Sequence, residues 1–329
     1  MKKRSRSIDV LRGMMMTFVV IAHFNREYLH DIIFLFHMPL FLVLSGLLLN
    51  QTKLVAEKSY LIGKTKSLLL PYMIYLTIDT FFIQRQWSIE SLVEVIWGGR
   101  AIGGVYWYIT CYLFTIFIFA ILLRKFPDRM VKGLILVGGG IAVIESHLVD
   151  KVHLLQSPGI PWNLDVSLMA LVYVGIGFFY KDKIKELLES ESKKYDLVAG
   201  IVVVVLLIFC WFIYSDDGNR LYYFDMKPVY YKELISAIVI PCAFGIVLVR
   251  LVHWMEKEKW LNLLNHLLIL CGRATIPIMF MHIPLNHWKE SLGYGRTVYV
   301  VIGIGIPIVF TLIFNKYKAI RKLFGLPKL

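Results

Sequence analysis

Long apolar runs recur along almost the whole chain and are separated by short polar segments. We count ten such runs, at roughly 8–24, 33–50, 67–84, 105–123, 131–147, 164–180, 196–215, 231–250, 264–285 and 297–315. An α-helix needs about 20 mostly apolar residues to cross a bilayer, and each run is close to that length. The pattern predicts an all-α polytopic membrane protein with about ten transmembrane helices. Residues 1–329 would form a single integral-membrane domain, because the spans leave no stretch for a separate soluble one.

The composition agrees with this prediction. Of the 329 residues, 58% are hydrophobic and 18% are charged, whereas about a quarter of a soluble domain is charged. The net charge of +13 does not indicate a nucleic acid partner, since the basic residues lie in short loops beside the runs. The four cysteines fall inside apolar runs without a CxxC pair. We interpret them as buried hydrophobic residues and expect no metal.

The lysines and arginines are distributed unevenly between the loops. If the N-terminus is cytoplasmic, 25 of the 36 lie on that side and 9 lie on the other. This bias follows the positive-inside rule and predicts that both termini are cytoplasmic. The remaining two, Arg12 and Arg273, fall within the runs themselves. An arginine at membrane depth costs a few kcal/mol unless it has a partner or a wet cavity.

The first run carries three polar groups in the stretch "SIDVLRGMMMTFVVIAH" (7–23). Arg12 and His23 are 11 residues apart, which on a helix is about three turns and about 16 Å along one face. Asp9 lies close to the same face. Such a stripe must face protein or water rather than lipid. Arg12 alone has a simpler interpretation, in which it reaches the headgroups or pairs with Asp9.

This stripe suits a reaction across the membrane. Arg12, near the cytoplasmic end, is placed to hold an anionic donor. His23, near the external end, is placed to accept a proton from an acceptor hydroxyl. The alternative for His23 is a structural histidine that is hydrogen-bonded to a neighbouring helix.

The second and ninth runs add further candidates. His37 opens the second run in "FHMPLFLVLSGLLL" (36–49) and either assists His23, contacts the acceptor or marks the membrane interface. In "CGRATIPIMFMHIPL" (271–285), Arg273 is a candidate for holding the donor and His282 for the acceptor side. These two are nine residues apart and do not share a helical face. Pro277 and Pro284 predict a kinked helix there.

Trp107 and Tyr108 open the fourth run at its external end. Aromatic residues at this position are typical of the belt at a membrane interface, and we interpret both as belt residues.

Three stretches together resemble the acyltransferase 3 family of bacterial membrane acyltransferases. "RSIDVLRGMMMTFVVIAH" (6–23) is similar to the family's opening with its Arg-x10-His spacing, which Arg12 and His23 satisfy. "FHMPLFLVLSGLLL" is similar to the second-span motif and "GRATIPIMFMHIPL" (272–285) to the penultimate one. The last stretch departs from the family, since many members carry a Ser-Tyr pair before "LxH". Ten spans with both ends cytoplasmic also match the family.

The resemblance implies a membrane O-acyltransferase in the bacterial cytoplasmic (inner) membrane. It would move an acyl group, most often acetyl, from cytoplasmic acyl-CoA to a hydroxyl of an extracytoplasmic or lipid-linked glycan. By the resemblance, Arg12 and His23 are the essential pair. From the residues themselves, we expect Asp9 to hold Arg12 in place. The chain would be a stand-alone form without an SGNH domain, with acyl-CoA as co-substrate, the glycan and membrane lipid as partners, and no metal.

Several alternatives stay open at this point. His23 either moves a proton or carries the acyl group transiently. The sequence leaves open whether two copies pair as a homodimer. The alternative function is a glycan or small-molecule transporter or flippase with the same polar stripe, although no internal repeat of the kind that many transporters show is visible. A non-catalytic membrane scaffold or sensor is the third interpretation.

Overall fold

The computed structural model describes residues 5–25, 27–98, 103–152, 159–213 and 221–329. Of these described residues, 79% are helical and almost none lie in strands, which confirms the predicted all-α class. The basic residues 2–4 of the N-terminus and the last two residues of the predicted 196–215 span lie outside these ranges.

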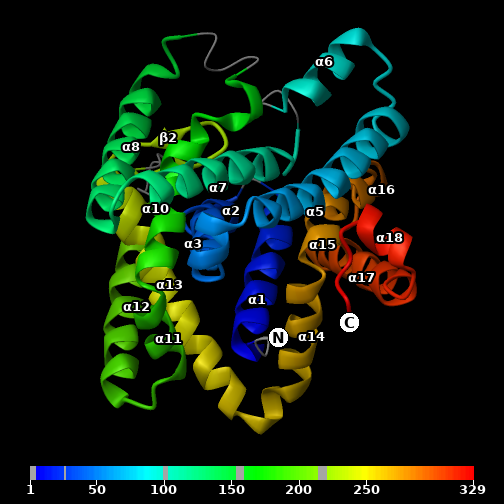
Figure 1. Ribbon diagram of the computed structural model, residues 1–329. Helices are drawn as coiled ribbons and strands as arrows, with labels where there is room; N and C mark the ends of the chain where they lie inside the picture. Colours follow the sequence, from blue (N-terminus) through cyan, green and yellow to red (C-terminus); the bar gives the residue numbers. More distant parts are fainter. Residues whose placement is uncertain (1–4, 26, 99–102, 153–158, 214–220) are drawn as a thin grey trace.

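The helices alternate between long membrane-length elements and short connecting ones (Figure 1). The first half of the chain forms α1 (Arg6–Ala22), α2 (Tyr28–Phe34), α3 (His37–Leu47), α4 (Gln51–Ala56), α5 (Lys58–Thr77) with the π-helical η1 (Ile78–Ile83), α6 (Ile89–Trp97), α7 (Trp107–Lys125) and α8 (Asp128–Leu148). The second half forms η2 (Pro161–Asn163), α10 (Val166–Phe179), α11 (Lys181–Glu189), α12 (Lys193–Ile213), the hairpin of β1 (Phe224–Asp225) and β2 (Tyr230–Tyr231), α13 (Leu234–Lys257), η3 (Lys259–Leu261), α14 (Asn262–Arg273), α15 (Thr275–Leu285), α16 (Lys289–Leu292), α17 (Arg296–Phe314) and α18 (Lys318–Leu323).

Eight helical segments among the described residues are long and apolar enough to cross a membrane. They are Tyr28–Leu47, Lys58–Ile83, Trp107–Lys125, Asp128–Leu148, Pro161–Phe179, Lys193–Ile213, Leu234–Lys257 and Arg296–Phe314. A ninth is the pair Lys259–Arg273 and Thr275–Leu285, which is bent by 86°. The first predicted run forms α1, whose 17 residues fall short of the usual span length. The count of ten spans and the cytoplasmic position of both termini therefore stay predictions.

The ninth predicted run is broken rather than gently kinked, and the break precedes both prolines. α14 ends at Arg273 and α15 begins at Thr275. Proline lacks an N–H, and its ring clashes with the carbonyl four residues earlier. For Pro277 that residue is Arg273, so a single straight helix cannot pass through this point. In the first turn of α15, by contrast, Pro277 is tolerated because no intrahelical donor is needed there.

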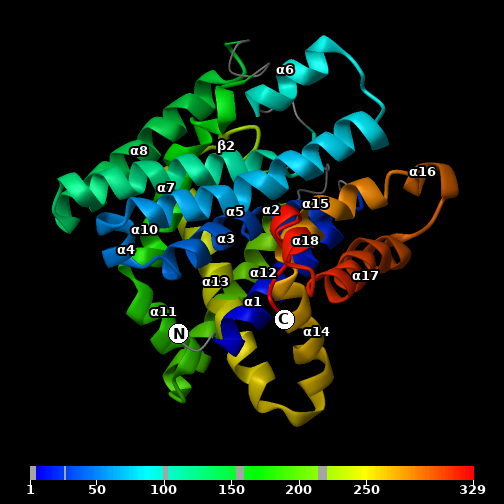
Figure 2. The ribbon, with the colours of Figure 1, turned by 45° about the vertical axis from the view of Figure 1, so that its right-hand side comes forward.

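α1 lies in the middle of the molecule, between α13 and α14 in both views (Figures 1 and 2). It packs against α14 through a glycine-to-glycine crossing. A Cβ added to Gly13 would lie 1.8 Å from the carbonyl oxygen of Leu268, and one added to Gly272 would lie 2.0 Å from that of Asp9. Small residues of this kind let membrane helices approach at backbone distance. The crossing fixes the rotation of α1 and hence the direction of its polar groups.

A second crossing of the same type joins α3 and α10. Added Cβ atoms on Gly46 and Gly177 would lie 2.1 Å from the carbonyl oxygen of Val174 and 1.9 Å from that of Val43, respectively. Small residues let these two helices approach closely as well. The two crossings therefore fix the positions of α1 and α3, which carry the candidate site residues Arg12 and His37.

Gly272→Ala is expected to lower the stability of the folded protein. The added methyl group overlaps the Asp9 carbonyl oxygen, and overpacking of this kind costs about 1–3 kcal/mol. The measurement is the melting temperature of the purified protein in detergent. Gly200→Ala on α12 is the matched control, because a Cβ there meets no atom within 4 Å. Equal melting temperatures for the two variants would contradict the crossing.

Candidate active site

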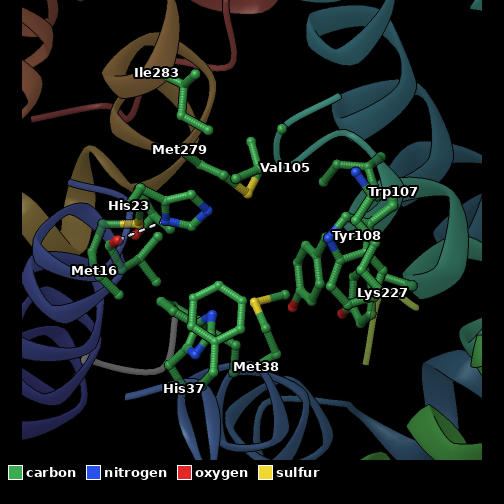
Figure 3. A pocket seen from close by; sticks show the side chains of 18 of the residues that line it. Met16, His23, His37, Met38, Val105, Trp107, Tyr108, Lys227, Met279 and Ile283 are labelled. Carbon is green, nitrogen blue, oxygen red and sulfur yellow. Dashed lines mark hydrogen bonds between the residues drawn. The ribbon is translucent and has the colours of Figure 1, made fainter. Parts of the chain in front are cut away.

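A cavity of about 880 Å³ lies between α1, α3, α5, α7 and α15, within the size range of small-molecule sites. Figure 3 shows His23 on one side of it, with Trp107, Tyr108 and Lys227 on the opposite side. The candidates Arg12, His23 and His37 line this cavity. Asp9, Arg273 and His282 are not among the lining residues. Asp9 and Arg273 pair with each other, and His282 packs against His23.

Arg12 and His23 face the same cavity, as their helical spacing predicts. Arg12 lies in the second turn of α1, and His23 is the residue that ends the helix, with its backbone N–H bonded to the last turn. One rigid helix therefore carries a guanidinium and an imidazole about 16 Å apart along its axis. The wall between them is apolar and includes Met16 and Val19.

The hydrogen bond of His23 determines which of its nitrogens is available for chemistry. Nδ1 lies 2.8 Å from the carbonyl oxygen of Val19. Because a carbonyl oxygen only accepts, Nδ1 donates its hydrogen, and Nε2 of the neutral ring keeps its lone pair. His23 therefore presents a base at Nε2 in a fixed ring orientation.

Two further histidines gather beside His23 around the ring of Phe34. The centroid of that ring lies 3.8 Å from that of His30, 4.6 Å from that of His37 and 5.7 Å from that of His23. Nδ1 of His30 donates to the Ala22 carbonyl oxygen and Nδ1 of His37 to that of Ile33, both at 2.8 Å. His30 was not predicted from the sequence, because it lies on the short helix α2, outside the predicted spans, and has no helical spacing to Arg12.

His282 packs directly against His23. The two ring centroids are 5.0 Å apart and the ring planes meet at 77°. The break before α15 makes this contact, because it turns the helix so that His282 lies behind His23 rather than on a straight continuation of α14. His282 is fully buried and is not among the lining residues, and its expected role on the acceptor side stays a prediction.

Asp9 is held by Arg273 from across the α1–α14 crossing. Nε of Arg273 donates to Oδ2 of Asp9 at 3.3 Å, where the Asp9 side chain is 3% exposed and that of Arg273 is 37% exposed. The two arginines that fall within the apolar runs therefore have different surroundings. Arg12 faces the cavity, whereas Arg273 pairs with Asp9, which lies one turn before Arg12 on α1.

Lys64 of α5 is another basic residue in the cavity lining. From the sequence it had been counted as a loop residue. Its Nζ donates to the hydroxyl of Tyr112 at 3.2 Å and lies 5.6 Å from the centre of that ring. Tyr112 in turn stacks on Tyr108, with ring centroids 5.9 Å apart.

Trp107 and Tyr108 both line the cavity, so the interpretation of these two residues as part of an aromatic belt at the membrane interface is wrong.

Phe24 and Asn25, directly after α1 and beside His23, also line the cavity. Lys289 binds both residues: its Nζ donates to the Phe24 carbonyl oxygen at 2.6 Å and to Oδ1 of Asn25 at 2.8 Å.

Hydrogen bonds from Asn25 and Arg296 hold the pKa of the nearby Glu27 carboxyl below its usual range. Glu27 therefore stays ionised and keeps its contact with Arg296 at 2.7 Å.

Polar side chains of the hairpin between β1 and β2 also line the cavity. They come from Tyr223, Asp225 and Lys227. The Asp225 carboxylate is fixed, because Oδ1 accepts from the Lys227 backbone N–H at 3.0 Å and Oδ2 from the Tyr223 hydroxyl at 3.3 Å. Two-residue strands give too weak a pattern to predict from the sequence, which explains why this segment was missed.

Residues 5–316, nearly the whole chain, match the family model of the acyltransferase 3 domain. No curated protein and no solved structure matches the chain. The matched range includes α1 and α15, and residues of both helices line the cavity. The chain is therefore a multi-pass membrane protein that belongs to the acyltransferase 3 family.

Proposed function

We propose that this protein transfers an acyl group, most often acetyl, from cytoplasmic acyl-CoA to a hydroxyl of an extracytoplasmic or lipid-linked glycan. The observation that carries the proposal is that Arg12 and His23 lie far apart on one helix and line one cavity. A donor held at one end and an acceptor at the other can meet inside that cavity. The protein would work in the bacterial cytoplasmic membrane.

The donor end is proposed to surround Arg12. A guanidinium binds phosphate oxygens through a planar fork of N–H donors, and CoA carries several phosphate groups. Lys64 adds another basic residue to the lining. Arg273 contributes indirectly, through its contact with Asp9. The acyl thioester would then extend along the apolar wall toward His23.

The acceptor end is proposed to lie at His23, with His37 beside it. Nε2 of His23 takes the proton from the acceptor hydroxyl as the oxygen attacks the thioester carbonyl carbon. The new C–O ester bond forms, the C–S bond breaks, and the CoA sulfur leaves with the bonding electron pair. The proton on Nε2 then passes to that sulfur, which yields free CoA and neutral His23.

Calorimetric titration of the purified protein with acetyl-CoA tests the donor half of this proposal. An acyltransferase is expected to bind both acetyl-CoA and CoA, whereas a glycan transporter or flippase has no reason to bind either. Vesicles that contain the protein and radiolabelled acetyl-CoA should also transfer the label to membrane-bound carbohydrate. Absence of both binding and transfer would contradict the proposed function and favour the transporter.

A further inference from the structure

One nitrogen of His282 has no use in the proposed reaction. The side chain is 0% exposed, and its Nδ1 donates to the Ile278 carbonyl oxygen at 2.9 Å. Nε2 therefore keeps its lone pair, and it is buried without a hydrogen-bond partner in the described part of the chain. Leaving a buried acceptor unpaired destabilises the folded protein. Because most buried polar atoms in proteins are paired, this nitrogen is a candidate for a functional role.

The surroundings of His282 hold it in this position. A Cβ added to Gly303 of α17 would lie 3.1 Å from the Cβ of His282, so α17 packs tightly against it. Nδ2 of Asn286 donates to the His282 carbonyl oxygen at 2.7 Å, and the Tyr294 hydroxyl donates to Oδ1 of Asn286 at 2.8 Å. These contacts hold the backbone of His282, and the bond from Nδ1 to Ile278 orients its ring.

The nearest ionisable neighbour of this ring is His23. The ring centroids are 5.0 Å apart in an edge-to-face arrangement. In the proposed reaction the His23 ring gains a positive charge, and around it lie apolar groups such as Phe34. A neutral imidazole with an uncommitted lone pair stabilises a nearby cation by a charge–dipole interaction that is strong where water is excluded. Two protonated rings at this distance would repel each other.

We propose that His282 is a positioning residue that stays neutral and stabilises the positive charge that His23 gains during acyl transfer. This inference rests on the proposed function. His282 takes no proton itself, because the proton moves from the acceptor hydroxyl to Nε2 of His23 and then to the CoA sulfur. In the resting protein the unpaired Nε2 of His282 destabilises the fold. When His23 is protonated, the interaction of its charge with His282 offsets this destabilisation.

Two substitutions test this role. His282→Leu removes the nitrogen at similar volume, whereas His282→Gln places an amide oxygen near the position of Nε2. In vesicles with radiolabelled acetyl-CoA, His282→Leu should lower kcat about 10- to 100-fold with KM for acetyl-CoA within about twofold. His282→Gln should retain clearly more kcat. The melting temperature of His282→Leu should stay equal or rise, because a buried unpaired polar atom has been removed.

His253→Leu is the matched control. His253 is also buried, and its Nδ1 donates to a carbonyl oxygen, that of Leu188, at 2.9 Å, but it lies on α13 outside the cavity. Its replacement should leave kcat unchanged. Wild-type kcat in His282→Leu, or equal losses in the Leu and Gln variants, would overturn the inference. Absence of transfer by the wild-type protein would instead contradict the proposed function.

Discussion

His23→Ala is expected to abolish acyl transfer, with a loss of about 10²–10⁴-fold in kcat, which is the usual contribution of general-base catalysis. The structure leaves Nε2 of His23 as the available lone pair on a ring that is fixed by its bond to Val19. His30 and His37 line the same cavity, but the bonds to Ala22 and Ile33 fix their rings at other positions in its wall. They are therefore not expected to replace His23.

The measurement is label transfer from radiolabelled acetyl-CoA in vesicles that contain equal amounts of folded protein. His266→Ala serves as the control, because His266 is exposed on α14 and lies outside the cavity. It should keep wild-type transfer. Activity of His23→Ala within a few-fold of wild type, at equal expression, would exclude His23 as the base.

Arg12→Met is expected to weaken the binding of acetyl-CoA about 10- to 100-fold. A hydrogen bond to a charged group contributes about 1.5–3 kcal/mol, and each 1.4 kcal/mol is a tenfold change in Kd. Arg12→Lys should give an intermediate Kd, because an ammonium keeps the charge but not the planar fork. Calorimetric titration with acetyl-CoA measures the wild type and both variants directly.

Arg6→Met provides the control on the same helix. Arg6 starts α1, is exposed and pairs with Glu256 at 3.7 Å outside the cavity. Its replacement should leave Kd unchanged. If Arg12→Met binds acetyl-CoA as tightly as the wild type while remaining folded, the donor is not held at this end of the cavity.

The sequence predicted features that depend on a single helix. The fold class follows from apolar runs of membrane length, and the shared face of Arg12 and His23 follows from helical periodicity within α1. Both are local properties, so they could be predicted without knowing how the helices pack. The distribution of Lys and Arg adds an orientation, which the structure does not test.

Contacts between distant segments could not be predicted in the same way. The pairing of Asp9 with Arg273 and the packing of His282 on His23 depend on the α1–α14 crossing and on the break before α15. Only Gly13, Gly272 and Pro277 point to these features, and a single glycine or proline in an apolar run does not specify which helix it will contact. Lys64 looked like a loop residue because the start of α5 lies before the apolar run begins.

The most direct test of the proposed function is mass spectrometry of the surface glycans of the source strain, its deletion strain and the deletion strain complemented with wild-type or His23→Ala protein. We expect that deletion removes an acyl mass from a glycan, that the wild-type protein restores it, and that His23→Ala at equal expression does not. Unchanged glycans in the deletion strain, or restoration by His23→Ala, would contradict the proposal.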